Sequence, residues 1–283
     1  MSAAGPQNLT ARGLIGPPTI VWGWKLSRLI RADWHIHTHL SDCGTPEATP
    51  EAIIRVAKEA GLEAIGLTDH VILREHRRRP AMVRAQVEKE TNGLRVYVGC
   101  EADMQSPTRA TIDEEFAAGL DYVIMSASHL YVSGVERPRD LSPRSMAALI
   151  LELTTGAIES GLADIVAHPF GVPESPFTFD EIVSEVDEEA LLRRGEEAAR
   201  AGVAFECNPR YLRRSPGAAG WLFSCLLETG VKLAVSSDAH HPQNVGCQGP
   251  QYATEAELRE AGIVEDCLWR IEDRKGAARG RAR

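Results

Sequence analysis

Seven short apolar segments, each followed by a stretch of helical period, recur along the chain from about residue 32. The segments are rich in Val, Ile and Ala and predict strands at residues 33–38, 64–68, 95–101, 122–126, 164–167, 203–206 and 232–236. Helices are expected between them, as at residues 50–60 and 145–160, where apolar residues recur at i, i+3 and i+4. Several of these helices are followed by glycine, which readily adopts the left-handed conformation that ends a helix, at Gly61, Gly161, Gly202 and Gly230. This order requires parallel strands joined by helical crossovers, either in a closed barrel or in an open doubly wound sheet.

The ends of the predicted strands distinguish these two folds, because they carry side chains that bind metals. Imidazole and carboxylate groups stand at or just beyond the carboxyl ends of the strands, at His35, His37, His70, Glu101, His129, His168, Asp238 and His240. In an open sheet only the strands beside a switch point share a site, whereas a barrel brings every strand end to one mouth. The pattern therefore favours a seven-stranded barrel with a single site.

His35 and His37 lie two positions apart in a predicted strand, so both imidazoles point to the same face and can hold one ion. Taken alone, such a pair is more often a surface or core pair, and Asp42 in the following loop reads as a solvated turn residue. The joint pattern is stronger, because six of the nine histidines stand at strand ends. Imidazole and carboxylate ligands without thiolate suit Zn, Mn or Fe.

Composition excludes other classes of function. Lys and Arg total 31 against 40 Asp and Glu, a net charge of -9, which argues against a nucleic-acid-binding protein. No stretch approaches the ~20 apolar residues that span a bilayer, so no membrane segment is expected. The six cysteines contain no CxxC pair, and no secretory segment precedes them. We interpret them as reduced thiols in a cytoplasmic protein.

In chain order, these motifs resemble those of the PHP (polymerase and histidinol phosphatase) family of metallophosphoesterases over roughly residues 32–246. The matching residues are His35-Ile36-His37-Thr38, Thr68-Asp69-His70, Glu101, His129, His168-Pro169 and Asp238-Ala239-His240. The resemblance implies a distorted (β/α)7 barrel in a single domain that holds three divalent metal ions, Zn, Mn or Fe. We expect this barrel at residues 32–272, after an N-terminal extension at residues 1–31 and before a basic disordered tail at residues 273–283.

The resemblance also implies which residues hold each ion. It assigns one ion to His35, His37, Glu101 and Asp238, a second to Glu101, His129 and His168, and a third to Asp42, His70 and His240. Histidinol phosphatases of the family carry Cys-Gly-His after the first motif, whereas this chain reads Ser41-Asp42-Cys43-Gly44. Asp42 matches the aspartate of the Ser-Asp-Gly sequence in other PHP phosphoesterases. Cys43 is an alternative ligand, against the interpretation that it is a bystander thiol.

The expected function is metal-dependent hydrolysis of a small-molecule phosphate ester by a histidinol-phosphatase-like phosphomonoesterase. A hydroxide that bridges two ions would attack phosphorus. The expected catalytic residues are Asp238, Glu101 and His240, with Asp238 exchanging the proton. Arg210 follows the predicted strand at residues 203–206 and is the candidate for binding the substrate phosphate, because a planar guanidinium forms two parallel hydrogen bonds. A solvated surface arginine is the alternative interpretation.

Three other functions stay open on the sequence. The same metal centre suits a phosphodiesterase. A phosphotriesterase or amidohydrolase also carries His-x-His on its first strand, but such enzymes commonly have a carbamylated lysine after the fourth strand, where residues 125–129 contain no lysine. A non-catalytic metal-binding PHP domain is expected to lack ligands, and none of the expected ligands is missing here.

Overall fold

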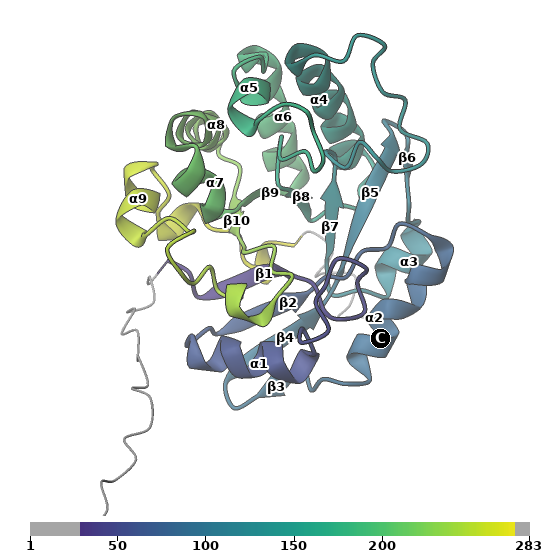
Figure 1. Ribbon diagram of the computed structural model, residues 1–283, viewed down its shortest axis with the longest axis vertical. Coiled ribbons are helices and arrows are strands. Elements are labelled where there is room, and N and C mark those ends of the chain that lie inside the picture. Colours follow the sequence, from purple (N-terminus) through teal and green to yellow (C-terminus); the bar gives the residue numbers. More distant parts are fainter. Residues whose placement is uncertain (1–28, 275–283) are drawn as a thin grey trace, which may run out of the picture.

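The computed structural model describes residues 29–274 of the chain. It has the predicted α/β class, with parallel strands and surrounding helices in one domain (Figure 1). The expected N-terminal extension and basic tail lie outside the described residues, except for their inner ends at residues 29–31 and 273–274.

All seven predicted strands are present, and one of them is divided in two. The strands that pair in parallel are β1 (Ala32–Ile36), β2 (Ala64–Leu67), β4 (Leu94–Val98), β5 (Cys100–Ser106), β7 (Val123–Ser126), β8 (Ile165–Ala167), β9 (Ala204–Cys207) and β10 (Leu233–Val235). The sequence pattern did not predict β3 (Glu90–Thr91) and β6 (Arg109–Ala110), which are two-residue strands that pair antiparallel at sheet edges.

The strands form two sheets rather than one continuous ladder. Their orders are β1-β2-β4-β3 and β10-β9-β8-β7-β5-β6. Two isolated parallel bridges join the sheets near the carboxyl ends of the strands, one between Ile36 and Ala239 and one between His70 and Glu101. The two sheets therefore meet at residues that belong to the predicted metal site or adjoin it.

The predicted strand at residues 95–101 divides at Gly99, where the chain passes from the first sheet to the second. β4 pairs with β2, and β5 pairs with β7. A Cβ atom at Gly99 would lie 2.6 Å from the Tyr122 carbonyl oxygen, so no side chain fits at this crossing. Glu101 follows two residues later, and the crossing places it between the two sheets.

Helices cover the outer faces of both sheets (Figure 1). The α-helices in residues 29–274 are α1 (Pro50–Glu59), α2 (Arg79–Arg84), α3 (Glu114–Ala118), α4 (Pro143–Glu159), α5 (Phe179–Val183), α6 (Glu188–Ala201), α7 (Pro209–Arg214), α8 (Pro216–Glu228) and α9 (Glu255–Glu260). α1 and α4 confirm the helices predicted at residues 50–60 and 145–160. The residue before each helix, Thr49 or Ser142, caps it by accepting a hydrogen bond from a backbone N–H of the first turn. A proline follows at the first position of each helix, where no backbone N–H is needed.

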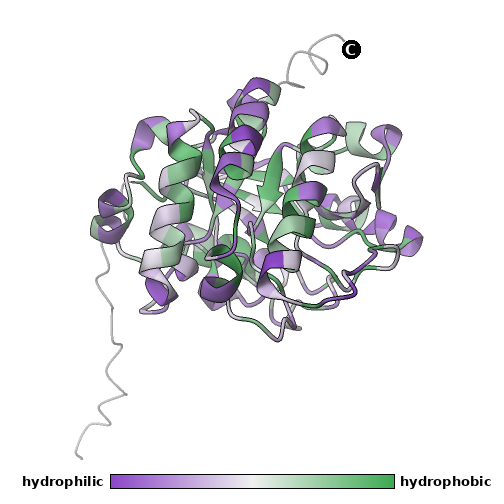
Figure 2. Cartoon of the chain, turned by 90° about the horizontal axis from the view of Figure 1, so that it is seen from above, coloured by the Kyte–Doolittle hydropathy of each residue, from purple (hydrophilic) through white to green (hydrophobic). Residues whose placement is uncertain are grey.

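Two hydrophobic clusters occupy opposite faces of the strands. Alternation along β7 places Val123 in the larger cluster under the helices and Ile124 in a smaller cluster on the other face. The smaller cluster contains Trp34, Tyr122 and Trp269, whose ring centroids lie 5.0–5.9 Å apart. Figure 2 shows the hydrophobic residues concentrated on the strands and on the helix faces turned toward them. Apolar side chains thus fill the space on the face of the strands opposite to the helices. The polar side chains of the predicted site lie at the carboxyl ends of the strands.

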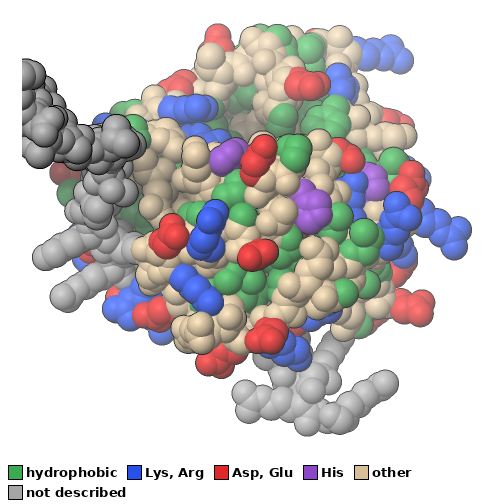
Figure 3. Space-filling view, turned by 60° about the horizontal axis from the view of Figure 1, so that its bottom comes forward, with side chains coloured by type: hydrophobic (Ala, Val, Ile, Leu, Met, Phe, Trp, Pro, Cys, Tyr) green, Lys and Arg blue, Asp and Glu red, His purple; other side chains and the backbone are tan. Residues whose placement is uncertain are grey.

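The surface carries both signs of charge. Figure 3 shows acidic and basic side chains interspersed on the face that it presents. Within residues 29–274, no helix has both the length and the apolar character needed to cross a membrane. That the chain binds no nucleic acid stays a prediction.

Candidate metal centre

Glu101 lies at the centre of the residues expected to bind metal. Its side chain is 1% exposed. Its Oε2 atom lies 3.1–3.3 Å from ring nitrogens of three imidazoles, those of His35, His37 and His70. Burial favours the neutral acid, but the positive charges of neighbouring histidines, that of His70 foremost, hold the pKa of Glu101 well below its usual value. The structure thus places an ionised carboxylate among imidazoles that come from different strands.

The second oxygen of Glu101 faces two further imidazoles. Oε1 lies 2.9 Å from His168 Nε2 and 3.7 Å from His129 Nε2. His168 follows β8 and His129 follows β7, so each of these strands delivers one imidazole to the same carboxylate. Glu101 can therefore contact two ions, one through each oxygen.

Asp238 approaches the group from the end of β10. Its Oδ1 atom lies 3.3 Å from His37 Nε2 and 3.6 Å from His35 Nε2. Asp238 has φ of 51°, in the left-handed region that non-glycine residues rarely adopt. Burial raises the pKa of Asp238, but the charge of His35 and the hydrogen bond from His37 outweigh burial and lower it. The strained backbone and the charge both keep this carboxylate directed toward the imidazoles.

His240 lies at the rim of the group. Its ring stacks on that of His37 with centroids 4.5 Å apart, and its Nδ1–H donates to the Asp238 carbonyl oxygen at 2.9 Å. Its side chain is 35% exposed, whereas those of His35 and His37 are fully buried. The structure therefore brings together Glu101, Asp238 and His240, the three residues predicted to be catalytic, with His240 the most accessible of them.

Buried carboxylates hold two of the imidazoles from behind. His35 Nδ1–H donates to Glu206 Oε1 at 3.1 Å, and His129 Nδ1–H donates to Asp103 Oδ1 at 2.7 Å. Glu206 also accepts a hydrogen bond from the Ser236 hydroxyl at 2.9 Å. Because Nδ1 donates to these carboxylates, Nε2 is the atom that faces Glu101, and it can bind a metal ion once that ion displaces any proton there, which is how metal-binding histidines are oriented.

Hydroxyl groups occupy the same position behind two other imidazoles. His168 Nδ1 lies 2.9 Å from Ser128 Oγ, and His37 Nδ1 lies 3.2 Å from Ser41 Oγ. Ser41 Oγ also accepts the backbone N–H of His70 at 3.0 Å. Each Nε2 atom is again left to face Glu101.

These atoms fit divalent cations. The Nε2 atoms of His35 and His37 lie 3.1 Å apart although each ring already has a partner on Nδ1. The buried Nδ1 of His70 has no hydrogen-bond partner among the described residues. Lone pairs that converge in this way repel one another unless a cation or a proton lies between them. Two groups have ligand atoms within 4.8 Å of one another, namely His35, His37 and Asp238, and Glu101, His129 and His168.

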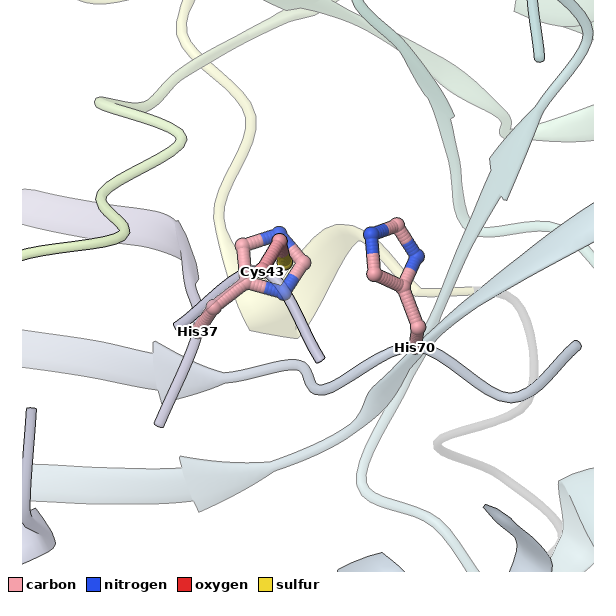
Figure 4. A group of neighbouring side chains, drawn as sticks. All are labelled: His37, Cys43 and His70. Atoms are coloured by element: carbon pink, nitrogen blue, oxygen red, sulfur yellow. The ribbon is translucent and has the colours of Figure 1, made fainter. Parts of the chain in front are cut away.

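A third group contains a residue that the resemblance did not assign. His37 follows β1, His70 follows β2, and the thiol of Cys43 enters from the loop after β1 (Figure 4). Their ligand atoms all lie within 4.8 Å of one another. Although burial opposes ionisation, hydrogen bonds with His240, His37 and His70 lower the pKa of Cys43 to about 3.

Asp42, the predicted ligand beside Cys43, lies outside these groups. Its side chain is 76% exposed. One carboxylate oxygen accepts from Arg79 Nη2 at 2.9 Å, and the other lies 3.7 Å from His76 Nε2. Because Arg79 also donates to the His70 carbonyl oxygen at 3.0 Å, the guanidinium fixes Asp42 on the outer side of His70.

Arg210, the predicted phosphate-binding residue, is half-buried against Tyr252. Its Nη2 donates to the Tyr252 hydroxyl at 2.9 Å, and its guanidinium carbon lies 5.3 Å from the centre of that ring. Arg210 is not among the described residues that line the cavity over the imidazoles. Binding of a phosphate group by Arg210 stays a prediction.

One wall of that cavity is apolar and aromatic. It is built by Tyr131, Val172, Pro173, Phe177, Phe179, Ile182 and Tyr211. The rings of Phe179 and Tyr211 stack with centroids 4.6 Å apart. The same cavity is lined by His70, His129, His168 and His240 and by the carboxylates of Glu101 and Asp238, so a bound molecule would contact polar and apolar side chains at once.

Sequence reasoning missed the two carboxylates behind the imidazoles. Glu206 lies in Ala-Phe-Glu-Cys of β9 and Asp103 in Cys-Glu-Ala-Asp-Met of β5. Both side chains are completely buried. A carboxylate inside an otherwise apolar strand was the available signal, since such a group is rarely buried without a partner.

Comparison with known proteins decides the family. The PHP domain matches residues 33–209 of this chain. The chain belongs to the PHP domain family. The family predicted from the strand-end motifs is therefore confirmed, and the match includes the first of the PHP motifs at His35 and ends before Asp238 and His240.

Similar proteins of this PHP domain family are named as phosphatases. A probable histidinol-phosphatase of Deinococcus radiodurans is 27% identical over 237 residues, which are 76% of this chain and 88% of the relative. A probable phosphatase of Caldicellulosiruptor bescii is 25% identical over 229 residues, 77% of this chain and 82% of the relative. The expected reaction class, metal-dependent hydrolysis of a phosphate ester, agrees with these names.

Solved structures share the fold of this PHP domain. Histidinol phosphate phosphatase from Lactococcus lactis, complexed with Zn, L-histidinol and phosphate, has a TM-score of 0.59 at 18% identity and covers 84% of this chain and 94% of its own. A putative histidinol phosphatase from Listeria monocytogenes has a TM-score of 0.54 at 16% identity, with 76% and 97% covered. These likenesses support the fold derived above.

Proposed function

We propose that this PHP domain chain is a phosphomonoesterase that hydrolyses small-molecule phosphate esters with divalent ions held at the carboxyl ends of its strands. The observation that carries the proposal is Glu101, an ionised buried carboxylate within 3.7 Å of five imidazoles. A carboxylate in this position can bridge two cations, and a pair of cations would promote hydrolysis of a phosphate ester by polarising the phosphoryl oxygens and activating water. The names of the relatives support the same reaction.

The donor sets suggest which residues hold the ions. One ion would be held by His35, His37, Glu101 and Asp238, and a second by Glu101, His129 and His168. A third would be held by His70 and His240 together with a donor from the loop after β1. When bound, divalent ions act as Lewis acids toward phosphoryl oxygens and lower the pKa of water. Zn, Mn and Fe all accept imidazole and carboxylate ligands, and the zinc in the Lactococcus lactis enzyme favours Zn among them.

The chain's own residues then supply binding and proton transfer. Asp238 is placed to accept a proton from the attacking water and to return it to the leaving oxygen. Glu101 keeps the ions adjacent, and His240 at the rim faces the entering phosphate. The apolar wall around Tyr211 and Phe179 would receive the organic part of the ester. Phosphate binding by Arg210 stays a prediction.

The proposal includes a small-molecule substrate and a cytoplasmic protein. Histidinol phosphate is the first substrate to test, because it is the substrate that the names of two relatives imply. All six cysteines are free, as is usual for a protein of a reducing compartment.

A panel of phosphate esters tests the function. Purified protein is analysed for bound metal and then assayed on histidinol phosphate, p-nitrophenyl phosphate, a diester and a triester, with Zn or Mn added. We expect monoesters to be hydrolysed fastest. His35→Ala, Glu101→Gln and His168→Ala should each lose bound metal and at least ~100-fold in rate. Asp238→Asn should slow all esters that the wild type cleaves.

Two results would contradict the proposal. Bound metal without turnover of any ester would indicate a non-catalytic metal-binding domain, and full activity of Glu101→Gln would exclude its bridging role. Glu189→Gln is the matched control, because this exposed residue pairs only with Arg193 on the surface of α6 and should leave rate and metal content unchanged.

A further inference from the structure

We propose that Cys43, and not Asp42, is the donor from the loop after β1 that binds the third ion of the centre together with His70 and His240, and that this thiolate makes the third site selective for zinc. The inference rests on the metal centre of the proposed function. It concerns a residue that the family resemblance leaves out, and it can fail while that function stands.

One carboxylate oxygen of Asp42 is held by Arg79. Arg79 is 8% exposed, and it is anchored by its bond to the His70 carbonyl oxygen. Its second nitrogen holds Asp42 Oδ1 at 2.9 Å. To reach an ion beside His70, Asp42 would have to leave a charged hydrogen bond and expose a buried guanidinium without its partner, which is costly.

The loop that carries Cys43 is tightly folded, so the direction of the thiol is fixed by the backbone. Gly44 N–H donates to the Ser41 carbonyl oxygen at 3.0 Å. A Cβ atom at Gly44 would lie 2.1 Å from the Thr38 carbonyl oxygen. Only glycine permits this close approach. The turn leaves Asp42 76% exposed, whereas Cys43 lies beside His37 and His70 (Figure 4).

The partners of the thiol are themselves prepared for an ion. Ser41 Oγ binds both the backbone N–H of His70 and the Nδ1 atom of His37, so one hydroxyl positions both imidazoles. His70 is 92% buried, and its Nδ1 atom lies 3.1 Å from Glu101 Oε2 without forming a hydrogen bond among the described residues. A ring nitrogen of His70 lies within 4.8 Å of Cys43 Sγ, and His240 is a hydrogen-bond partner of the same thiol. Ligands of one tetrahedral zinc lie about 3.5 Å apart, so a small contraction completes the site.

Replacing a carboxylate by a thiolate changes which ion the site prefers. Carboxylate oxygen suits Mn and Mg, whereas thiolate with imidazole selects Zn. We therefore expect the third site to bind Zn more tightly than Mn. Cys43 is also the one cysteine of the chain with an exposed residue surface, while Cys267 is half-buried and the other four are buried. A thiol reagent should consequently compete with this ion and with no other.

Cobalt provides a direct readout, because a cobalt–thiolate bond gives a near-ultraviolet charge-transfer band that imidazole and carboxylate ligands do not give. Metal-free protein is titrated with Co²⁺ while the absorption spectrum and the bound metal are recorded. In the wild type we expect the band to reach, once all sites are filled, the intensity of one cobalt–thiolate site per chain. Cys43→Ser should abolish it, and Asp42→Asn and Cys267→Ser, the two controls, should retain it.

Zinc content and thiol reactivity provide a second readout. Cys43→Ser should weaken the binding of one zinc ion by at least ~10-fold, and Cys43→Asp should recover an ion without the charge-transfer band. Saturating zinc should slow the reaction of Cys43 with a disulfide reagent by at least ~10-fold, judged in Cys267→Ser protein.

The outcomes separate the two proposals. A wild type that binds cobalt and hydrolyses esters but has no charge-transfer band overturns the role of Cys43 and leaves the phosphomonoesterase intact. Loss of the band in Asp42→Asn overturns the choice of Cys43 over Asp42. Protein that binds no metal and turns over no ester overturns both.

Discussion

Glu206 offers the sharpest test of how the protein prepares its imidazoles. The carboxylate is completely buried and accepts three hydrogen bonds, from His35 Nδ1–H, from the Ser236 hydroxyl and from the backbone N–H of His168. Glu206→Gln keeps the size of the side chain but replaces one acceptor oxygen by a donor. We expect this variant to fold, to bind metal more weakly and to be less stable.

The magnitude follows from the two ways in which glutamine can lie. If its oxygen remains toward His35, its amide group faces the His168 N–H, and an unsatisfied buried donor costs about 1–3 kcal/mol of stability. If the amide is flipped, its N–H faces His35 Nδ1, so the proton of that ring moves to Nε2 and occupies the lone pair directed at Glu101. Loss of such an orienting partner lowers metal affinity by about 10–100-fold, or roughly 1.4–2.7 kcal/mol.

Two measurements decide the matter. Zinc affinity is measured by competition with a chromophoric chelator, and the free energy of unfolding of the metal-free protein is measured in urea. Glu189→Gln, an exposed change of the same chemistry, serves as the control. If Glu206→Gln binds zinc within twofold of the wild type and unfolds at the same urea concentration, then Glu206 does not orient His35.

Three further predictions test other parts of the structure. Asp103→Asn should lower metal affinity about 10-fold or more, because it removes the acceptor for His129 Nδ1–H; chelator competition measures this, and wild-type affinity would contradict it. Gly66→Ala should destabilise the fold by about 1–3 kcal/mol in urea unfolding, since its Cβ would lie 1.7 Å from the Tyr122 hydroxyl, whereas Gly217→Ala, with nothing within 4 Å, should change stability by less than about 1 kcal/mol. Chelation of bound metal should abolish activity. If the free ion had been present at 1,000 times its Kd, chelation should also lower the free energy of unfolding by about 4 kcal/mol. An unchanged melting temperature would contradict the prediction that the metal binds only the folded chain.

Most of the fold could be predicted because the buried strands and amphipathic helices are local patterns. The exception at residues 95–101 has a physical reason. The apolar run continues through Gly99 without interruption, and the division into β4 and β5 arises only because the strand must pass the Tyr122 carbonyl oxygen on its way between the sheets. The two-residue strands β3 and β6 are too short to have a period.

The metal-binding residues could be predicted where they stand at the ends of strands, because the strands themselves are visible in the sequence. The resemblance named Glu101, Asp238 and the imidazoles, which the structure brings within a few ångströms of one another. It could not show which of Asp42 and Cys43 faces inward, because the direction of both side chains depends on contacts made in the folded chain. The turn at Gly44 packs against the Thr38 carbonyl oxygen, and Arg79, from a different segment, holds Asp42.

The order of assembly is a consequence of how the ligands are distributed along the chain. Residues 35–240 contribute them from the ends of six strands and one loop, so no contiguous fragment much shorter than this contains the donors of both ions that we propose to share Glu101. A metal therefore cannot nucleate folding here as it does in a small zinc-dependent module. Contacts between residues far apart in the chain must form before the last imidazole is in place, which makes folding comparatively slow. Cations would then bind after the chain has folded and stabilise the folded state.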